Sequence, residues 1–107
     1  MGSGSTVQEF VAVRSREQIT AARLAAVGER PEACGAQAAY HWVLQPNCPA
    51  PVSGTRLPSL RELDLAVEER AAIEAARDTG RPLAERAFAR GAARAIGWVL
   101  GFAPLDD

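Results

Sequence analysis

The sequence predicts an all-α protein, a four-helix bundle built from two duplicated helical hairpins with a short extended arm at its N-terminus. Three observations predict this fold class. Residues 35–44 and residues 91–100 share the pattern Gly-Ala-x-x-Ala-x-x-Trp-Val-Leu. Upstream of each copy lies the string Ile-x-Ala-Ala-Arg, at 19–23 and at 73–77, followed by a Gly and an Arg-Pro pair. The segments between these turn residues carry apolar residues at helical spacing, and an internal repeat of this size is typical of one copied supersecondary unit.

Length and composition limit the function classes. A chain of 107 residues with a net charge of −1 is one domain, with no overall electrostatic reason to bind DNA or anionic lipid. No apolar run approaches the ~20 residues that cross a bilayer, and the N-terminus lacks a signal-peptide pattern, so we expect a cytoplasmic protein. All the basic residues are arginine and alanine is abundant, which is typical of a GC-rich genome such as that of an actinobacterium or its phage.

The N-terminal residues 1–14 are expected to form a flexible lead and an apolar arm, the arm running over 7–13. Two interpretations of this arm stay open: a strand that pairs with a second copy across a dimer axis, or an arm packed on its own bundle. Residues 15–107 are expected to form a single helical domain, with repeat one at 15–51 and repeat two at 58–104.

In the first repeat, a capping box at 15–18 predicts a helix that ends near Val27, before Gly28. Pro31 suits the first turn of the next helix, which is expected to end near Gln45. This second helix is apolar on most of its circumference, which is typical of a helix buried on several sides. We therefore expect it to be a central helix, a dimer-interface helix, or both.

In the second repeat, the proline-rich linker at 46–55 leads to a second capping box, Ser59 with Glu62. The third helix is expected to continue to about Asp78, with a buried stripe of Leu60, Leu63, Val67 and Ala71. The fourth helix opens at Pro82 and has one apolar face formed by Ala84, Phe88, Gly91, Ala92, Ala95, Trp98, Val99 and Phe102.

Glycine occupies the same repeat position on the second and fourth helices, at Gly35 and Gly91. Glycine inside a helix costs about 1 kcal/mol, so its presence there suggests that another backbone comes close, with a neighbouring Trp ring filling the gap. A pseudo-twofold axis would pack these two helices as equivalents and place Trp42 and Trp98 against one another in the centre.

The candidate partner or phosphate contact is a row of arginines on the fourth helix, Arg86, Arg90 and Arg94, on the side opposite the apolar face. The simpler interpretation, which the net charge favours, is a solvated face neutralised by Glu85 and by acids of the third helix. A second candidate set, Tyr40, Trp42, Phe88 and Trp98, is expected to line the core or a small-ligand pocket between the repeats.

Metal, disulfide and catalytic interpretations fail on spacing or context. Cys34, His41 and Cys48 are evenly spaced, but Cys34 and His41 are about 10 Å apart along a helix and cannot share one zinc ion. The same separation argues against a disulfide between Cys34 and Cys48. The acids of the third helix, Glu62, Asp64, Glu68, Glu69 and Glu74, are expected on its surface, and we predict no catalytic residue, metal ligand or cofactor.

The sequence therefore predicts a non-enzymatic protein-interaction module whose partner is a second copy of itself or another protein, a homodimer being favoured. A nucleic-acid-binding regulator that uses the arginine row is the first alternative, and a small-ligand-binding bundle is the second. No membrane partner is expected.

Overall fold

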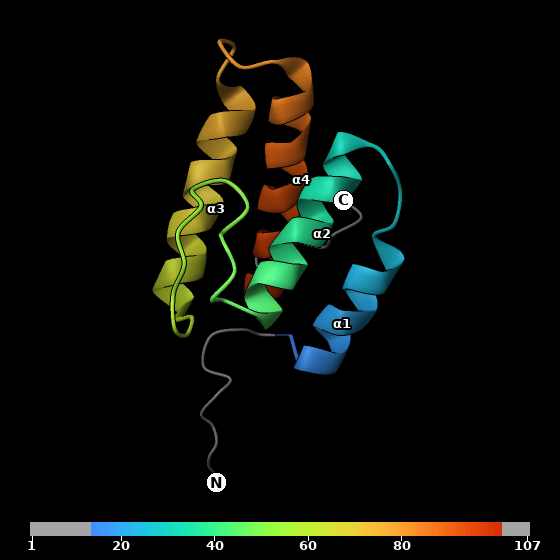
Figure 1. The fold of residues 1–107 in the computed structure, drawn as a ribbon, viewed down its shortest axis with the longest axis vertical. Coiled ribbons are helices and arrows are strands. Elements are labelled where there is room, and N and C mark those ends of the chain that lie inside the picture. The colour runs from blue at the N-terminus through green and yellow to red at the C-terminus, as the bar shows by residue number, and fades with distance from the viewer. Residues whose placement is uncertain (1–13, 102–107) are drawn as a thin grey trace, which may run out of the picture.

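The computed structural model describes residues 14–101, which form four helices and no strand. The predicted all-α class is therefore confirmed for this part of the chain, while the proposed arm at 7–13 lies outside the described residues. Figure 1 shows the helices side by side in the order α3, α4, α2, α1, with α2 packed on α4, α3 packed on α4, and α1 packed on α2. Their bounds are α1 (Arg16–Ala25), α2 (Pro31–Leu44), α3 (Glu62–Arg77) and α4 (Leu83–Leu100).

The first predicted capping box is confirmed and the second is wrong. Ser15 Oγ accepts from the Gln18 N–H at 3.1 Å, and Gln18 Oε1 accepts from the Ser15 N–H at 2.9 Å. In the second repeat the helix begins two residues later than expected, at Glu62, where Asp64 Oδ2 accepts from the Arg61 N–H at 2.8 Å. The predicted cap residue Ser59 is exposed at a bend of the linker, and the buried Leu60 that follows it also precedes the helix.

The two central helices, α2 and α4, cross with their backbones in contact at the predicted glycines. A Cβ atom on Gly35 would overlap the carbonyl oxygen of Phe88, and a Cβ atom on Gly91 would overlap the carbonyl oxygen of Glu32. These two contacts are reciprocal, because Phe88 precedes Gly91 by the same three residues that separate Glu32 from Gly35. The predicted close approach is confirmed, but the atoms that fill the space are those of the facing backbone and not a Trp ring.

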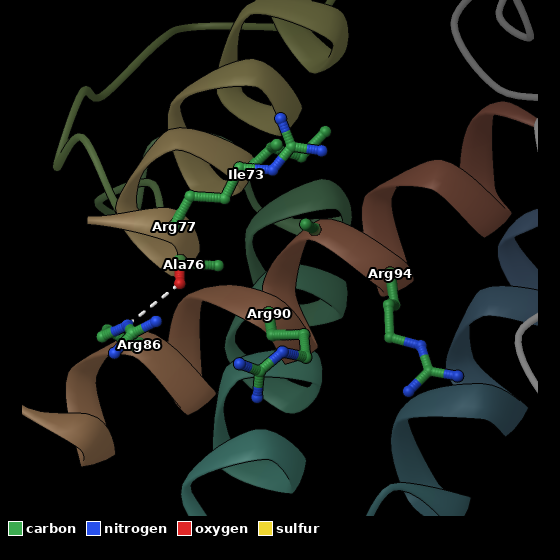
Figure 2. Close-up of a pocket in the computed structure, with 7 residues that line it drawn as sticks. Ile73, Ala76, Arg77, Arg86, Arg90 and Arg94 are labelled. Atoms are coloured by element: carbon green, nitrogen blue, oxygen red, sulfur yellow. Dashed lines mark hydrogen bonds between the residues drawn. The ribbon is translucent and has the colours of Figure 1, made fainter. Parts of the chain in front are cut away.

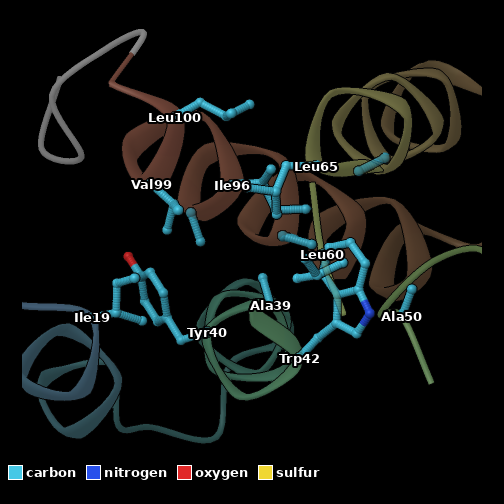
Figure 3. Close-up of a cluster of buried hydrophobic side chains, with 13 residues drawn as sticks. Ile19, Ala39, Tyr40, Trp42, Ala50, Leu60, Leu65, Ile96, Val99 and Leu100 are labelled. Carbon is cyan, nitrogen blue, oxygen red and sulfur yellow. The ribbon is translucent and has the colours of Figure 1, made fainter. Parts of the chain in front are cut away.

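The expectation that the two indole rings pack on each other is wrong. Trp98 makes an edge-on contact with Tyr40, with ring centroids 5.9 Å apart, and the guanidinium of Arg14 lies 4.7 Å from its ring centroid. Trp42 is fully buried on the other side of α2, beside Leu60 (Figure 3). Residues two positions apart on a helix point to opposite sides, so Tyr40 and Trp42 cannot both face Trp98 on α4.

The predicted buried stripe of α3 is also wrong in its register. Leu63 and Val67 are 65 % and 60 % exposed, and Leu60 is buried but precedes the helix instead of belonging to it. The buried positions of α3 are instead Leu65, Glu68, Ala72 and Ala75. The helix is turned so that this face meets both α4 and the linker, and one of its buried residues is a carboxylate.

The buried Glu68 side chain of α3 accepts hydrogen bonds from the linker. Its Oε2 accepts from the backbone N–H groups of Val52 and Ser53 at 2.8 and 2.9 Å, and its Oε1 accepts from the Ser53 hydroxyl at 2.6 Å. A buried carboxylate is tolerated only when its oxygens are paired in this way. The proline-rich linker is thus held over the side of the core that contains Trp42, and it is not a free hinge.

Replacing Tyr40 by Phe is expected to stabilise the fold. The Tyr40 hydroxyl is buried and has no hydrogen-bond partner among the described residues, so its removal should raise the free energy of unfolding by about 1 kcal/mol. Burial also raises the pKa of Tyr40 to about 12. The folded state therefore keeps a proton that the unfolded state loses, and the wild type should lose stability between pH 10 and 12. Urea unfolding of the wild type and Y40F across this pH range measures the loss of stability. An equal loss in Y40F would contradict its assignment to the Tyr40 hydroxyl.

Candidate functional site

A groove lined by arginines runs between α3 and α4. Its volume is about 500 Å³, and within the described part of the chain its lining contains no Asp or Glu. Ile73, Ala76 and Arg77 line it from α3, and Arg86, Arg90, Ala93 and Arg94 line it from α4. Figure 2 shows three arginines following one another along α4, with Arg77 on the neighbouring helix. We call this surface the arginine groove.

The two ends of the arginine row are held by the protein itself. Arg86 is half-buried, and its Nε donates to the carbonyl oxygen of Ala76 at 3.1 Å, which joins α4 to the last turns of α3 (Figure 2). Arg94 Nη1 lies 3.3 Å from Glu32 Oε2 on α2, with both side chains nearly half exposed. These contacts tie Arg86 to α3 and Arg94 to α2.

Two arginines of the groove carry uncompensated charge. Arg77 and Arg90 are exposed, and neither forms an ion pair with a carboxylate in residues 14–101. These two cations are open to a ligand, whereas Arg86 and Arg94 are engaged by the protein. Like charges at this spacing repel one another, and an anion in the groove would relieve that repulsion. The floor between them is apolar, because it is formed by Ile73, Ala76 and Ala93.

The arginines singled out from the sequence are brought together, but the compensating charge is not where it was expected. Glu85 lines a different and smaller hollow of about 200 Å³ against the linker, and the carboxylate near the row belongs instead to Glu32 of α2. Sequence reasoning missed Arg77, which it treated only as the last residue of the repeated string. Because α3 and α4 are antiparallel neighbours joined by a short turn, Arg77 returns beside Arg86, and a helical-hairpin alignment would have found this.

The aromatic set does not gather around one pocket. Tyr40 and Trp42 are core residues, and Trp98 is half-buried beside Tyr40. Phe88 is half-buried and lines the 200 Å³ hollow together with Val52 and Ala75. None of these four residues lines the arginine groove.

Of the three evenly spaced cysteine and histidine residues, two meet. Cys48 Sγ lies 3.5 Å from His41 Nε2, whereas Cys34 is exposed near the start of α2 with its Sγ 3.9 Å from the Gly28 carbonyl oxygen. Both thiols are free. Across residues 14–101, no cluster of three or more His, Cys, Asp or Glu side chains has a geometry that would hold a metal ion.

Neither a membrane-spanning helix nor a known relative helps to interpret the arginine groove. None of the helices in the described region combines the length and the apolar character that crossing a bilayer requires. Comparison with protein-family models, with curated proteins and with solved structures found no match to this chain. The arginine groove is therefore interpreted from its own geometry and charge.

Proposed function

We propose that this protein is a non-enzymatic interaction module that binds an acidic segment of a partner protein in the arginine groove. The observation that supports the proposal is a hollow lined by four arginines, two of them without an ion pair in residues 14–101, whose described lining contains no carboxylate. Arginine binds carboxylates with planar, paired hydrogen bonds, which suits recognition of Asp and Glu side chains. The apolar floor adds room for the hydrophobic side chains that accompany such acids.

A protein partner fits this surface better than a nucleic acid does. The net charge of the chain is −1, and α3 carries acidic residues on the same hairpin that forms the groove. Nucleic-acid affinity depends on a broad basic field that displaces counterions along the phosphate backbone. A groove with an apolar floor and a short row of cations offers a local contact and not such a field.

The finer architecture is part of this proposal. We propose that the chain is a four-helix bundle that arose by duplication of one hairpin, and the reciprocal contacts of Gly35 and Gly91 support it. The copies then diverged on their outer faces. The row that reads Arg86, Arg90, Arg94 in the second copy reads Arg30, Cys34, Ala38 in the first. One copy alone therefore carries the arginine groove, and the expected stoichiometry is one acidic segment per chain.

The double variant R77A/R90A is expected to weaken binding of a glutamate-rich peptide by about tenfold, because it removes two exposed charge contacts. The matched control is R30A/R56A, which removes the same charge from exposed positions elsewhere and should bind like the wild type. Isothermal titration calorimetry at low salt measures both. No peptide binding, equal loss in the two variants, or tighter binding of a DNA duplex than of the peptide would each overturn the proposal.

We also propose that the chain forms a homodimer, with the outer face of α3 in the interface. Its support is the pair Leu63 and Val67, which lie one turn apart and are mostly exposed. The apolar character of α2, from which the sequence predicted a dimer interface, gives weaker support, because Tyr40 and Trp42 are buried within one chain. Size-exclusion chromatography with light scattering should give a dimer mass for the wild type and a monomer mass for V67E. A monomeric wild type at high concentration would remove this proposal.

A further inference from the structure

We propose that the ligand of the arginine groove is an amphipathic helix with carboxylates at positions i, i+4 and i+8. This inference rests on the proposed function and specifies the conformation and residue pattern of the partner segment. It does not require the chain to be a dimer.

The backbone chemistry of the groove favours a helical ligand. Both walls are α-helices whose N–H and C=O groups are used inside the helix, so the groove offers no sheet edge to an extended peptide. An extended ligand lying on Ile73, Ala76 and Ala93 would cover its own peptide groups with apolar side chains and leave them unpaired. A helix satisfies those groups internally and presents only side chains to the groove.

The spacing of the cations matches one face of such a helix. Arg86, Arg90 and Arg94 are four residues apart, which places successive positions about 6 Å apart along α4. Carboxylates at i, i+4 and i+8 of a helix lying along the groove have the same interval, so the central one faces Arg90 and the outer two lie near Arg86 and Arg94, which already contact Ala76 and Glu32. Contact at Arg94 would compete with Glu32, which lies 3.3 Å away and is nearly half exposed.

The floor fits the apolar side of the ligand. Two of its three residues are alanines, Ala76 and Ala93, which let another helix approach closely. Ile73 is the largest apolar side chain among the described lining residues, and it lies beside Arg77 on α3 (Figure 2). A ligand residue such as Leu at i+3 or i+7 would lie beside Ile73, while Arg77 reaches the ligand from the opposite wall. The hollow of about 500 Å³ accommodates a few side chains and not a whole helix, so the ligand helix lies on the groove.

The test compares three labelled peptides of about 14 residues, or four helical turns, by fluorescence anisotropy with the full chain. The first has Glu at i, i+4 and i+8 with Leu at i+3 and i+7. The second has the same composition with the Glu residues adjacent, and the third is the first with a central proline that breaks the helix. The patterned peptide is expected to bind about tenfold more tightly than the other two, because its carboxylates share one helix face, whereas the second peptide spreads them around the helix and the third cannot form the helix.

The outcomes separate this inference from the function on which it rests. Equal affinity of all three peptides, lost in R77A/R90A and kept in R30A/R56A, would overturn the helical ligand and leave the acidic-segment proposal intact. Tighter binding of the proline peptide than of the patterned one would overturn the inference in the same way. No binding of any peptide would overturn both. A patterned-peptide preference that disappears in R77A/R90A supports both.

Discussion

Replacing Gly35 or Gly91 by alanine is expected to destabilise the fold by about 2–3 kcal/mol, although the same change in an ordinary helix stabilises by about 1 kcal/mol. The added Cβ at either position would overlap a carbonyl oxygen of the facing helix. Because the obstructing atoms belong to the backbone, no side chain can rotate away, and α2 and α4 must separate. That separation loosens the core on both sides of the crossing. Urea unfolding monitored by circular dichroism measures the change in the free energy of unfolding.

Gly97 supplies the matched control on α4. A Cβ atom there would meet Glu69 Oε2 at 3.0 Å, the far end of a flexible side chain that can move aside. Gly97→Ala is therefore expected to be neutral or slightly stabilising, since it gains helix propensity. If G35A and G91A were as stable as G97A, the backbone contact between the central helices would not exist as described.

Replacing Trp42 by alanine is expected to cost about 3–5 kcal/mol, because it leaves a large cavity in the core. Trp98 lies at the matching repeat position but is half-buried, so Trp98→Ala should cost less than Trp42→Ala. The remaining loss at Trp98 would come from its contacts with Tyr40 and Arg14. Thermal unfolding of both variants measures the difference between the two copies of the repeat.

A spectroscopic control avoids variants that fail to fold. In W98F the emission reports Trp42 alone, and acrylamide should quench it weakly because the ring is buried. In W42F the emission reports Trp98, which is more accessible and should be quenched more strongly. Equal quenching in the two variants would mean that the indoles have equivalent environments, as a strictly symmetric pair would.

The repeat pattern predicted the four helices and the close approach of α2 and α4, but its prediction that the two indoles meet at the centre was wrong. Paired turn residues located the four helices, and Gly35 and Gly91 marked the place where two backbones meet. It failed where the two copies differ. The register of α3 depends on the linker, since buried Glu68 binds the linker backbone and turns Leu63 and Val67 outward. A carboxylate on a buried helix face is not predictable from hydrophobic periodicity, because its partners come from a distant segment.

Three of the four arginines of the candidate site were predicted from the sequence. The spacing of Arg86, Arg90 and Arg94 on one helix follows from helical periodicity alone. The contribution of Arg77 depends on how α3 packs against α4, and the pairing of Arg94 depends on where α2 places Glu32. Both are tertiary facts. Which carboxylates neutralise the arginine row could therefore not be predicted from the helical wheel, because the wheel shows one helix without its tertiary neighbours.

The most direct test of the arginine groove is a methyl and amide NMR titration of the full chain with the glutamate-patterned peptide. The account predicts that the largest shift changes fall on Ile73, Ala76 and Ala93, which form the floor, and on the arginine Nε–H groups beside them. The equivalent outer face of the first repeat, at Arg30 and Cys34, should stay unchanged. Shift changes centred on that face, or spread evenly over the surface, would contradict the account.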